Sequence, residues 1–232
     1  MIKWDYMETT YLKRFINYSA KKTAFIPIGT LEWHGNHLPI ETDFLVAQKI
    51  CEIISKKITG YLLPPIYLGS GTKKKINGEW FIGMDKYLKK KLPGNLYYLE
   101  PDFFSKVLVK LGNSLVGQGF RKIFVITGHG GRGQMRALML AKKKLKNLVI
   151  INVYDVLEEK GMAVEHADEY ETSLFWACYP EEERKSRKIK IKKNDDYFTF
   201  IGYDPRKKAS LKLGNKILKE IISNLTKKIV NS

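Results

Sequence analysis

The chain has 232 residues, 44% of them hydrophobic, so it is long enough and apolar enough to bury one sizeable core. This composition excludes an intrinsically disordered chain, and no apolar run reaches the length of a membrane span. We therefore expect a single domain over residues 1–232, and a cytoplasmic one, because the N-terminal residues lack the apolar core of a signal peptide.

The formal net charge of +17 leaves three explanations open: a solvated surface, a site for an anionic small molecule, or a nucleic-acid interface. The basic residues recur in short groups, at Lys73–Lys75, Lys89–Lys91, Lys142–Lys144 and Arg184–Lys193. They are not interleaved with the exposed aromatic residues or the recognition-helix pattern of nucleic-acid modules. Nucleic acid is therefore the least favoured partner.

Short apolar runs alternate with amphipathic segments along the chain. The runs predict strands over 24–28, 61–68, 122–127 and 148–156, and a charge-protected edge strand over 188–192. Helical spacing predicts helices over 5–21, 42–59, 102–118, 135–145, 168–177 and from 209 onward. This alternation predicts an α/β fold with three layers, in which helices cover both faces of a largely parallel sheet.

Residues 69–96 interrupt the alternation with a basic, glycine-containing segment that is too long for an ordinary connection. Segments of this length are usually lids or binding loops. The lysines at 73–75 and 89–91 would suit a negatively charged substrate, and a solvated loop is the alternative interpretation.

Acidic residues and histidines follow the first predicted strand, in the order Glu32, His34, His37, Glu41 and Asp43. Loops that leave the carboxyl ends of buried strands are where α/β proteins place their sites. Imidazole and carboxylate are common ligands of zinc, manganese and ferrous iron. The alternatives are that Glu32 and His34 cap the next helix, and that Asp43 is a helix cap and does not face back toward His34.

All the histidines of the chain, His34, His37, His129 and His166, lie in three glycine-rich or acidic junctions. His129 also leaves a predicted strand, and Gly130 and Gly131 after it suit either a tight turn or an anion-binding loop. Asp168 is a candidate cap of the following helix. The histidines coincide with Glu32, Asp43 and Glu171, which favours a metal centre. Cys51 and Cys178 lie in apolar helical patterns and are expected to be small buried side chains.

Three phrases, IPIGTLEWHGNHLPIETD, ITGHGG and HADEYETS, resemble the signatures of the creatininase (creatinine amidohydrolase) family. Leu92-Pro93-Gly94 and IGYDPRKKASLKLG, from Ile201 to Gly214, extend the resemblance over most of the chain. The resemblance implies a homo-oligomer, commonly a hexamer. It also implies two divalent metal ions per subunit (zinc, manganese or iron), which activate water to hydrolyse a non-peptide C–N bond.

Carried over position by position, the resemblance implies that Glu32 and His129 hold one metal ion, His34 and Glu171 hold the other, and Asp43 bridges them. Paired cations lower the pKa of a bridging water and polarise the substrate carbonyl. His166 is the candidate carrier of the proton for the leaving nitrogen, or a partner of the oxyanion. The roles of His37 and Glu169 stay open.

Several positions depart from the creatinine-hydrolysing pattern. Gly130 and Gly131 replace an aromatic residue and a carboxylate, and Met162 replaces a tryptophan. Thr127 and Arg132 replace asparagines, and Asp168 replaces a glycine. These departures leave metal binding intact and argue against creatinine itself as the substrate.

We therefore expect a metal-dependent amidohydrolase acting on a small amide, a cyclic amide or a formamide. One branch of the resembled family deformylates a phosphorylated formamidopyrimidine of flavin and deazaflavin synthesis, and residues 73–91 with Arg132 would suit its phosphate. Another branch trims a modified peptide. The alternatives from other classes are a basic nucleic-acid-binding protein on a hydrolase scaffold and a structural oligomer with a vestigial site.

Overall fold

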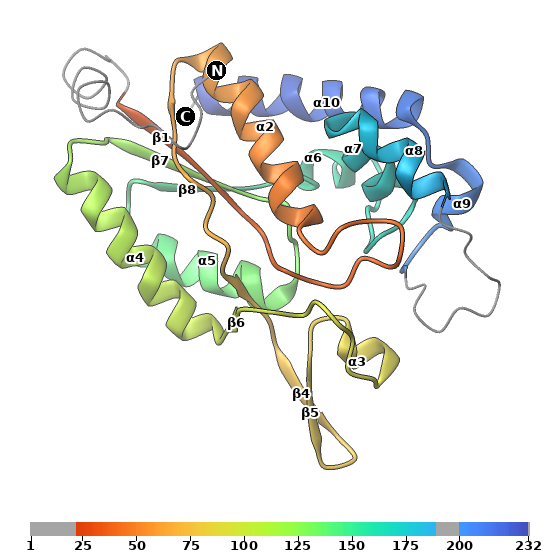
Figure 1. The fold of residues 1–232 in the computed structure, drawn as a ribbon. Helices are drawn as coiled ribbons and strands as arrows, with labels where there is room; N and C mark the ends of the chain where they lie inside the picture. Colours follow the sequence, from red (N-terminus) through yellow and green to blue (C-terminus); the bar gives the residue numbers. More distant parts are fainter. Residues whose placement is uncertain (1–21, 189–199, 232) are drawn as a thin grey trace.

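The computed structural model describes residues 22–188 and 200–231, and its central feature is a parallel sheet (Figure 1). The four strands lie in the order β2–β1–β7–β8, with β1 at Thr23–Ile28, β2 at Tyr61–Leu62, β7 at Lys122–Thr127 and β8 at Leu148–Asn152. β1 and β7 pair along their full length, from Thr23 opposite Lys122 to Ile28 opposite Thr127. The carboxyl ends of the two central strands therefore lie side by side.

Side chains of the central strands alternate between two hydrophobic clusters, one on each face of the sheet. Phe25 and Phe124 enter one cluster, whereas Ile26 and Val125 enter the other. This alternation follows from the two-residue period of a strand, and it explains why both faces read as apolar in the sequence.

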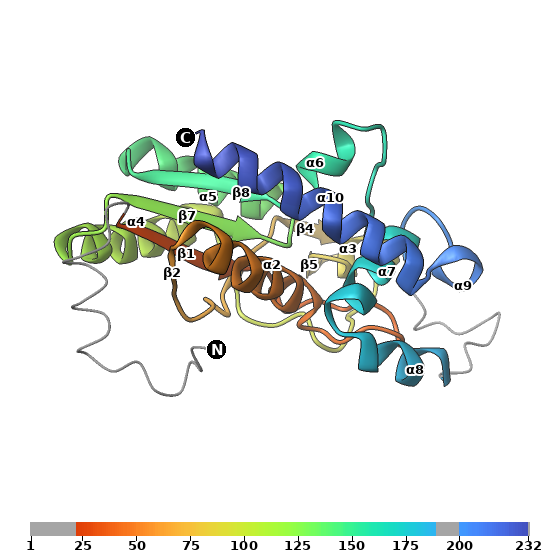
Figure 2. The ribbon, with the colours of Figure 1, turned by 90° about the horizontal axis from the view of Figure 1, so that it is seen from above.

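Helices cover both faces of the sheet, which gives the predicted three layers (Figure 2). One face carries α2 (Thr42–Ile58), α7 (Glu169–Cys178) and α10 (Leu211–Val230); the other carries α4 (Pro101–Gly117) and α5 (Arg132–Lys144). The shorter helices are α3 (Asp85–Leu88), α6 (Asp155–Glu158), α8 (Pro180–Lys188) and α9 (Pro205–Lys208). The α/β fold class predicted from the sequence is confirmed.

Two strands are shorter than predicted. The run 61–68 forms only Tyr61–Leu62 and an isolated bridge between Ile66 and Ile28, because Pro64 and Pro65 lack the N–H groups that a ladder needs. The run 148–156 stops at Asn152, and α6 begins at Asp155.

The segment 69–96 is more ordered than a loop. It contains β3 (Gly69–Ser70), which pairs with β6 (Tyr98–Leu99), and a hairpin of β4 (Lys73–Ile76) and β5 (Glu79–Ile82). The hairpin turns at Asn77-Gly78, both with positive φ, which is the usual chemistry of a two-residue hairpin turn. Figure 1 shows the hairpin extending away from the sheet.

The buried face of α4 is not the one that the spacing of its apolar residues suggests. Helical spacing puts Phe103, Leu108 and Leu111 on one side, but Phe103 and Leu111 are 56% and 41% exposed, whereas Phe104 is buried. α4 packs closely on the end of α5: a Cβ on Gly112 would lie 2.0 Å from Leu145 Cδ2. This contact fixes the rotation of the helix and leaves Phe103 in solvent.

The predicted helix over 5–21 lies outside the described residues. So does the predicted edge strand over 188–192, except Lys188, which ends α8. Among the described helices, none combines the length and the apolar character that crossing a membrane requires.

Candidate metal centre

The predicted site residues meet where β1 and β7 end. Glu32 and His34 follow β1, His129 follows β7, and Asp43 lies in the first turn of α2. The start of α2 fits between the two strand ends only because both continue with glycine: a Cβ on Gly29 would lie 2.6 Å from Asp43 Cβ, and one on Gly128 would lie 2.2 Å from the Asp43 carbonyl oxygen. The two glycines therefore bring Asp43 to the junction.

Asp43 faces a different histidine with each carboxylate oxygen. Its Oδ1 lies 3.3 Å from His34 Nε2, and its Oδ2 lies 3.0 Å from His129 Nδ1. Thr30 donates to Oδ2 from its backbone N–H and, at 2.5 Å, from its hydroxyl. Of the two alternatives for Asp43, the structure shows the one in which it faces back over the loop toward His34.

His34 is buried, and its hydrogen bonding determines its tautomer. Its Nδ1 lies 2.9 Å from the backbone carbonyl of Glu32, which can only accept, so Nδ1 carries the proton. Nε2 points at Asp43 and Glu171, where it can bind either a proton or a metal ion. A ring nitrogen directed at two carboxylates, with the other ring nitrogen bonded to a carbonyl, is the arrangement of a metal-binding histidine.

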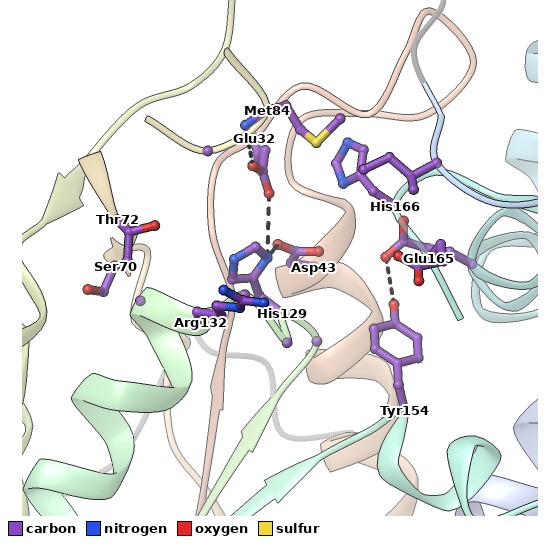
Figure 3. A pocket seen from close by; sticks show the side chains of 18 of the residues that line it. Glu32, Asp43, Ser70, Thr72, Met84, His129, Arg132, Tyr154, Glu165 and His166 are labelled. Atoms are coloured by element: carbon purple, nitrogen blue, oxygen red, sulfur yellow. Dashed lines mark hydrogen bonds and ion pairs between the residues drawn. The ribbon is translucent and has the colours of Figure 1, made fainter. Parts of the chain in front are cut away.

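Glu32, Asp43 and His129 form one group, the outer group, whose ligand atoms all lie within 4.8 Å of one another. Glu32 Oε2 is 3.5 Å from His129 Nδ1, and Glu32 Oε1 accepts a hydrogen bond from the Met84 backbone N–H (Figure 3). All three side chains line a cavity of about 510 Å³. This volume suits a small-molecule site.

His34, His166 and Glu171 form the inner group, again with ligand atoms within 4.8 Å of one another. Glu171 Oε1 accepts from the Tyr154 hydroxyl at 2.8 Å, and Oε2 accepts from the Ala167 N–H. The His166 ring lies 4.4 Å from that of His34, and its Nε2 is bonded to the Trp33 carbonyl. The structure thus places the predicted proton carrier, His166, among groups that could also hold an ion.

The buried charges perturb one another strongly. Burial disfavours the charged imidazoles of His34 and His129, but the nearby carboxylates, Asp43 first, outweigh it and raise their pKa values to about 10 and about 9. Burial acts to raise the pKa of Asp43, and the two imidazoles overcome it and hold that pKa below its usual range. Burial raises the pKa of Glu171 to about 7. The cluster therefore favours positive charge, as a cation site does.

The other candidate residues lie outside the two ligand groups. Asp168 caps α7, as predicted, by accepting hydrogen bonds from the N–H groups of Tyr170 and Glu171. His37 Nε2 lies 3.0 Å from the Thr172 hydroxyl, and burial lowers the pKa of His37 to about 3. Glu169 is only 5% exposed and does not point to solvent. Cys51 and Cys178 are both free and buried, as expected.

Sequence reasoning missed three residues that hold the predicted ligands: Thr30, Met84 and Tyr154. Thr30 directly follows Gly29 and could have been suspected from its place in the junction. Tyr154 stands two residues after β8, so the rule that sites gather at strand ends would have included it. No sequence signal pointed to Met84, which contributes only its backbone N–H.

Comparison with known families fits this geometry. The sequence profile of the family described as creatinine amidohydrolase (creatininase) matches residues 7–229. The chain belongs to this family. A creatinine amidohydrolase of Pseudomonas putida is 22% identical over 177 residues, which cover 67% of this chain and 64% of that protein. The aligned region thus spans less than two thirds of that relative.

Solved structures of creatininases share the fold. A mutant creatininase described as a Zn–Zn type superposes with a TM-score of 0.72 at 18% identity, covering 97% of this chain and 95% of the other. A manganese form of creatininase superposes with a TM-score of 0.69 at 19% identity, covering 97% of this chain and 96% of the other. The fold of this chain is thus the one on which creatininases carry zinc or manganese, and the two ligand groups described above lie in it.

Proposed function

We propose that residues 1–232 form a single, cytoplasmic hydrolase domain that hydrolyses a non-peptide C–N bond of a small amide, cyclic amide or formamide with two divalent metal ions. The observation that carries the proposal is Asp43, whose two oxygens face the imidazoles of two separate ligand groups. A carboxylate shared in this way reduces the repulsion between two neighbouring cations. Family membership supports the reaction class.

We propose Glu32 and His129 for one ion, His34 and Glu171 for the other, and Asp43 for both. Zinc, manganese or iron would suit this set of nitrogen and oxygen donors. When bound, such a pair lowers the pKa of water and polarises the amide carbonyl. The chain's own contribution is to keep the ligands in position through Thr30 and Tyr154, and to close the inner side of the site with buried residues.

We propose His166 as the carrier of the proton for the leaving nitrogen. It lines the cavity beside the inner group, and its Nε2 is bonded to the Trp33 carbonyl, so its other ring nitrogen is left to exchange a proton. Burial lowers the pKa of His166 to about 4. The imidazole is therefore neutral before it accepts a proton.

The proposed substrate is a formamide, for which we favour a phosphorylated formamidopyrimidine over creatinine. Gly130 and Gly131 line the cavity without adding an aromatic contact or a ligand, and Met162 packs against the hydrophobic core. At these positions the chain therefore lacks the groups of the creatinine-hydrolysing pattern, and the aromatic side chains that line the cavity, among them Tyr87 and Tyr98, come from other positions. The basic side chains of the cavity suit a phosphate.

The experiment has two parts. Elemental analysis of protein purified without added metal should find two divalent ions per chain. A screen of formamides, cyclic amides and creatinine should then find hydrolysis that a chelator abolishes and added metal restores. The alternative, a nucleic-acid-binding protein, instead predicts binding that ignores chelators and weakens steeply with salt.

We also propose a homo-oligomer, with a hexamer as the form that the resemblance implies. Large hydrophobic side chains are exposed on α4 and α5, among them Phe103, Leu111 and Met139. Such groups are common where subunits associate. Light scattering of the purified protein tests this, and a monomer at working concentration would contradict it.

A further inference from the structure

The basic side chains that reach the cavity are not those of the predicted lysine groups. Within the described chain, the cavity is lined by Lys86 of α3 and Arg132 of α5, and by none of the lysines at 73–75 and 89–91. Those lysines do not line the cavity although they belong to the same segment. Any anion recognition inside the cavity therefore depends on Lys86 and Arg132.

Lys86 is held at the cavity wall. α3 begins just after Met84, whose N–H is bonded to Glu32, so the helix is tied to the outer group. The Lys86 Nζ donates to the Thr72 hydroxyl at 2.7 Å, and both side chains line the cavity. Because the ammonium occupies the Thr72 acceptor, the Thr72 hydroxyl proton is left to donate to a third group.

Arg132 lies close to this pair. A Cβ on Gly133 would lie 2.7 Å from the Gly71 backbone, so the start of α5 packs directly against the chain that carries Thr72. The pKa of Lys86 is lowered by burial, and the positive charges of Arg132 and Lys74 lower it further, against the attraction of Glu32. Two cations thus face one space and repel each other.

Neither cation has an acidic partner at ion-pair distance within the described residues, unlike the surface pairs Arg136–Asp102 and Arg187–Glu183. Among the cavity's other acids, Glu165 lies beside His166, on the side of Asp43 away from Thr72 and Arg132 (Figure 3). Two cations without acidic partners line the same cavity as the proposed metal ligands, which suits a ligand with one anionic end.

We propose that Lys86, Arg132 and Thr72 form a subsite for an anionic substituent of the substrate, a phosphate or a carboxylate. This inference rests on the proposed function, because it takes the cavity as the substrate site. The three donors offer charge-assisted hydrogen bonds from different directions, which suits the three terminal oxygens of a phosphate ester. The uncapped first turn of α5, which begins at Arg132, adds a favourable dipole.

The subsite is tested first by binding, without hydrolysis. Calorimetry on the metal-loaded protein compares 4-aminophenyl phosphate, 4-aminobenzoate and 4-aminophenol, which share a ring and differ in the anionic group. Lys86→Met and Arg132→Met should each weaken phosphate binding by about tenfold or more and leave 4-aminophenol binding unchanged. If the two variants weaken the binding of 4-aminobenzoate by the same factor, the subsite also binds carboxylates.

The matched controls are Arg136→Met, on the same helix and paired with Asp102 at the surface, and Lys75→Met, on the hairpin and outside the cavity. Both should bind the phosphate as the wild type does. If the double variant of Lys86 and Arg132 binds it as tightly as the wild type, the metal ions alone hold the anion and the subsite is overturned.

Hydrolysis assays distinguish a failure of the subsite from a failure of the proposed function. Failure of the function would appear as no hydrolysis of 4-formamidophenyl phosphate although the amino product still binds. Failure of the subsite would appear as equal kcat/KM for that compound and 4-formamidophenol. The proposal expects a preference for the phosphate that Lys86→Met and Arg132→Met reduce through KM.

Discussion

The outer and inner groups lie on either side of the Asp43 carboxylate and differ in exposure and support. In the outer group, the His129 side chain is 16% exposed, and Glu32 is held by one backbone N–H. In the inner group, His34 is fully buried, and Glu171 is bonded through both oxygens. If each group holds an ion as proposed, we expect the more strongly supported inner group to be preorganised and the outer group to exchange its ion more readily.

The largest expected effect comes from Asp43, whose carboxylate faces a histidine of each group. Asp43→Asn removes the negative charge between the two histidines and should lower activity by more than about 10⁴-fold, beyond the contribution of a single proton-transfer residue. Activity assays and elemental analysis check this. Glu41→Gln is the control, since Glu41 precedes α2 and its side chain makes no cap hydrogen bond. An active Asp43→Asn variant with two ions would refute the shared role.

His166→Ala tests whether His166 carries a proton or binds an ion with the inner group. If His166 carries the proton, kcat should fall by about 10²–10⁴-fold while both ions are retained. The measurement is kcat together with the metal content of the same preparation. Loss of one ion would contradict the proton-carrier role and make His166 a ligand of the inner group.

Tyr154→Phe weakens the support of the inner group alone. The variant keeps the ring and loses the hydrogen bond to Glu171, so we expect a loss of about 10–100-fold in affinity for one of the two ions, with the other unchanged. Competition with a chelator measures both affinities. Tyr179→Phe is the matched control, since its hydroxyl is bonded to the Leu45 carbonyl away from the ligands. Equal losses at both ions would remove the distinction between the groups.

The smallest effect concerns stability in acid. The pKa of His37 in the folded protein, about 3, lies below its ordinary 6.5, so between these values the unfolded chain binds one proton more. The free energy of unfolding therefore falls as the pH decreases below 6.5. Urea unfolding of metal-free protein should show that the wild type loses about 2 kcal/mol more than His37→Gln between pH 7 and pH 5. Equal losses of unfolding free energy in the two proteins would contradict the lowered pKa of His37.

Local patterns in the sequence predicted the local features of the site correctly. Apolar runs ending in glycine located β1 and β7, and the acid before a helical pattern located the cap at Asp168. These features depend on neighbours within a few residues. The grouping of the histidines with Glu32, Asp43 and Glu171 also predicted which side chains meet, except for His37, which contacts Thr172 instead.

Features set by distant contacts were not predictable in the same way. Phe103 and Phe104 are adjacent and equally apolar, and the packing of α4 on α5 and the sheet, where Phe104 joins the hydrophobic cluster, decides which of them is buried. The bond from Tyr154 to Glu171 depends on how the chain after β8 meets α7. The hairpin differs from these features, because its Asn77-Gly78 turn is a local sequence signal of two paired strands.

Gly29 and Gly128 have a consequence for how this protein tolerates change. Neither residue offers a donor atom, yet even an alanine methyl group at either position would displace the helix turn that carries the bridging carboxylate. In a saturation library selected for activity, both positions should therefore appear as intolerant as the histidines. A ranking of positions by mutational sensitivity would thus place the two glycines that make room for Asp43 beside the proposed metal ligands.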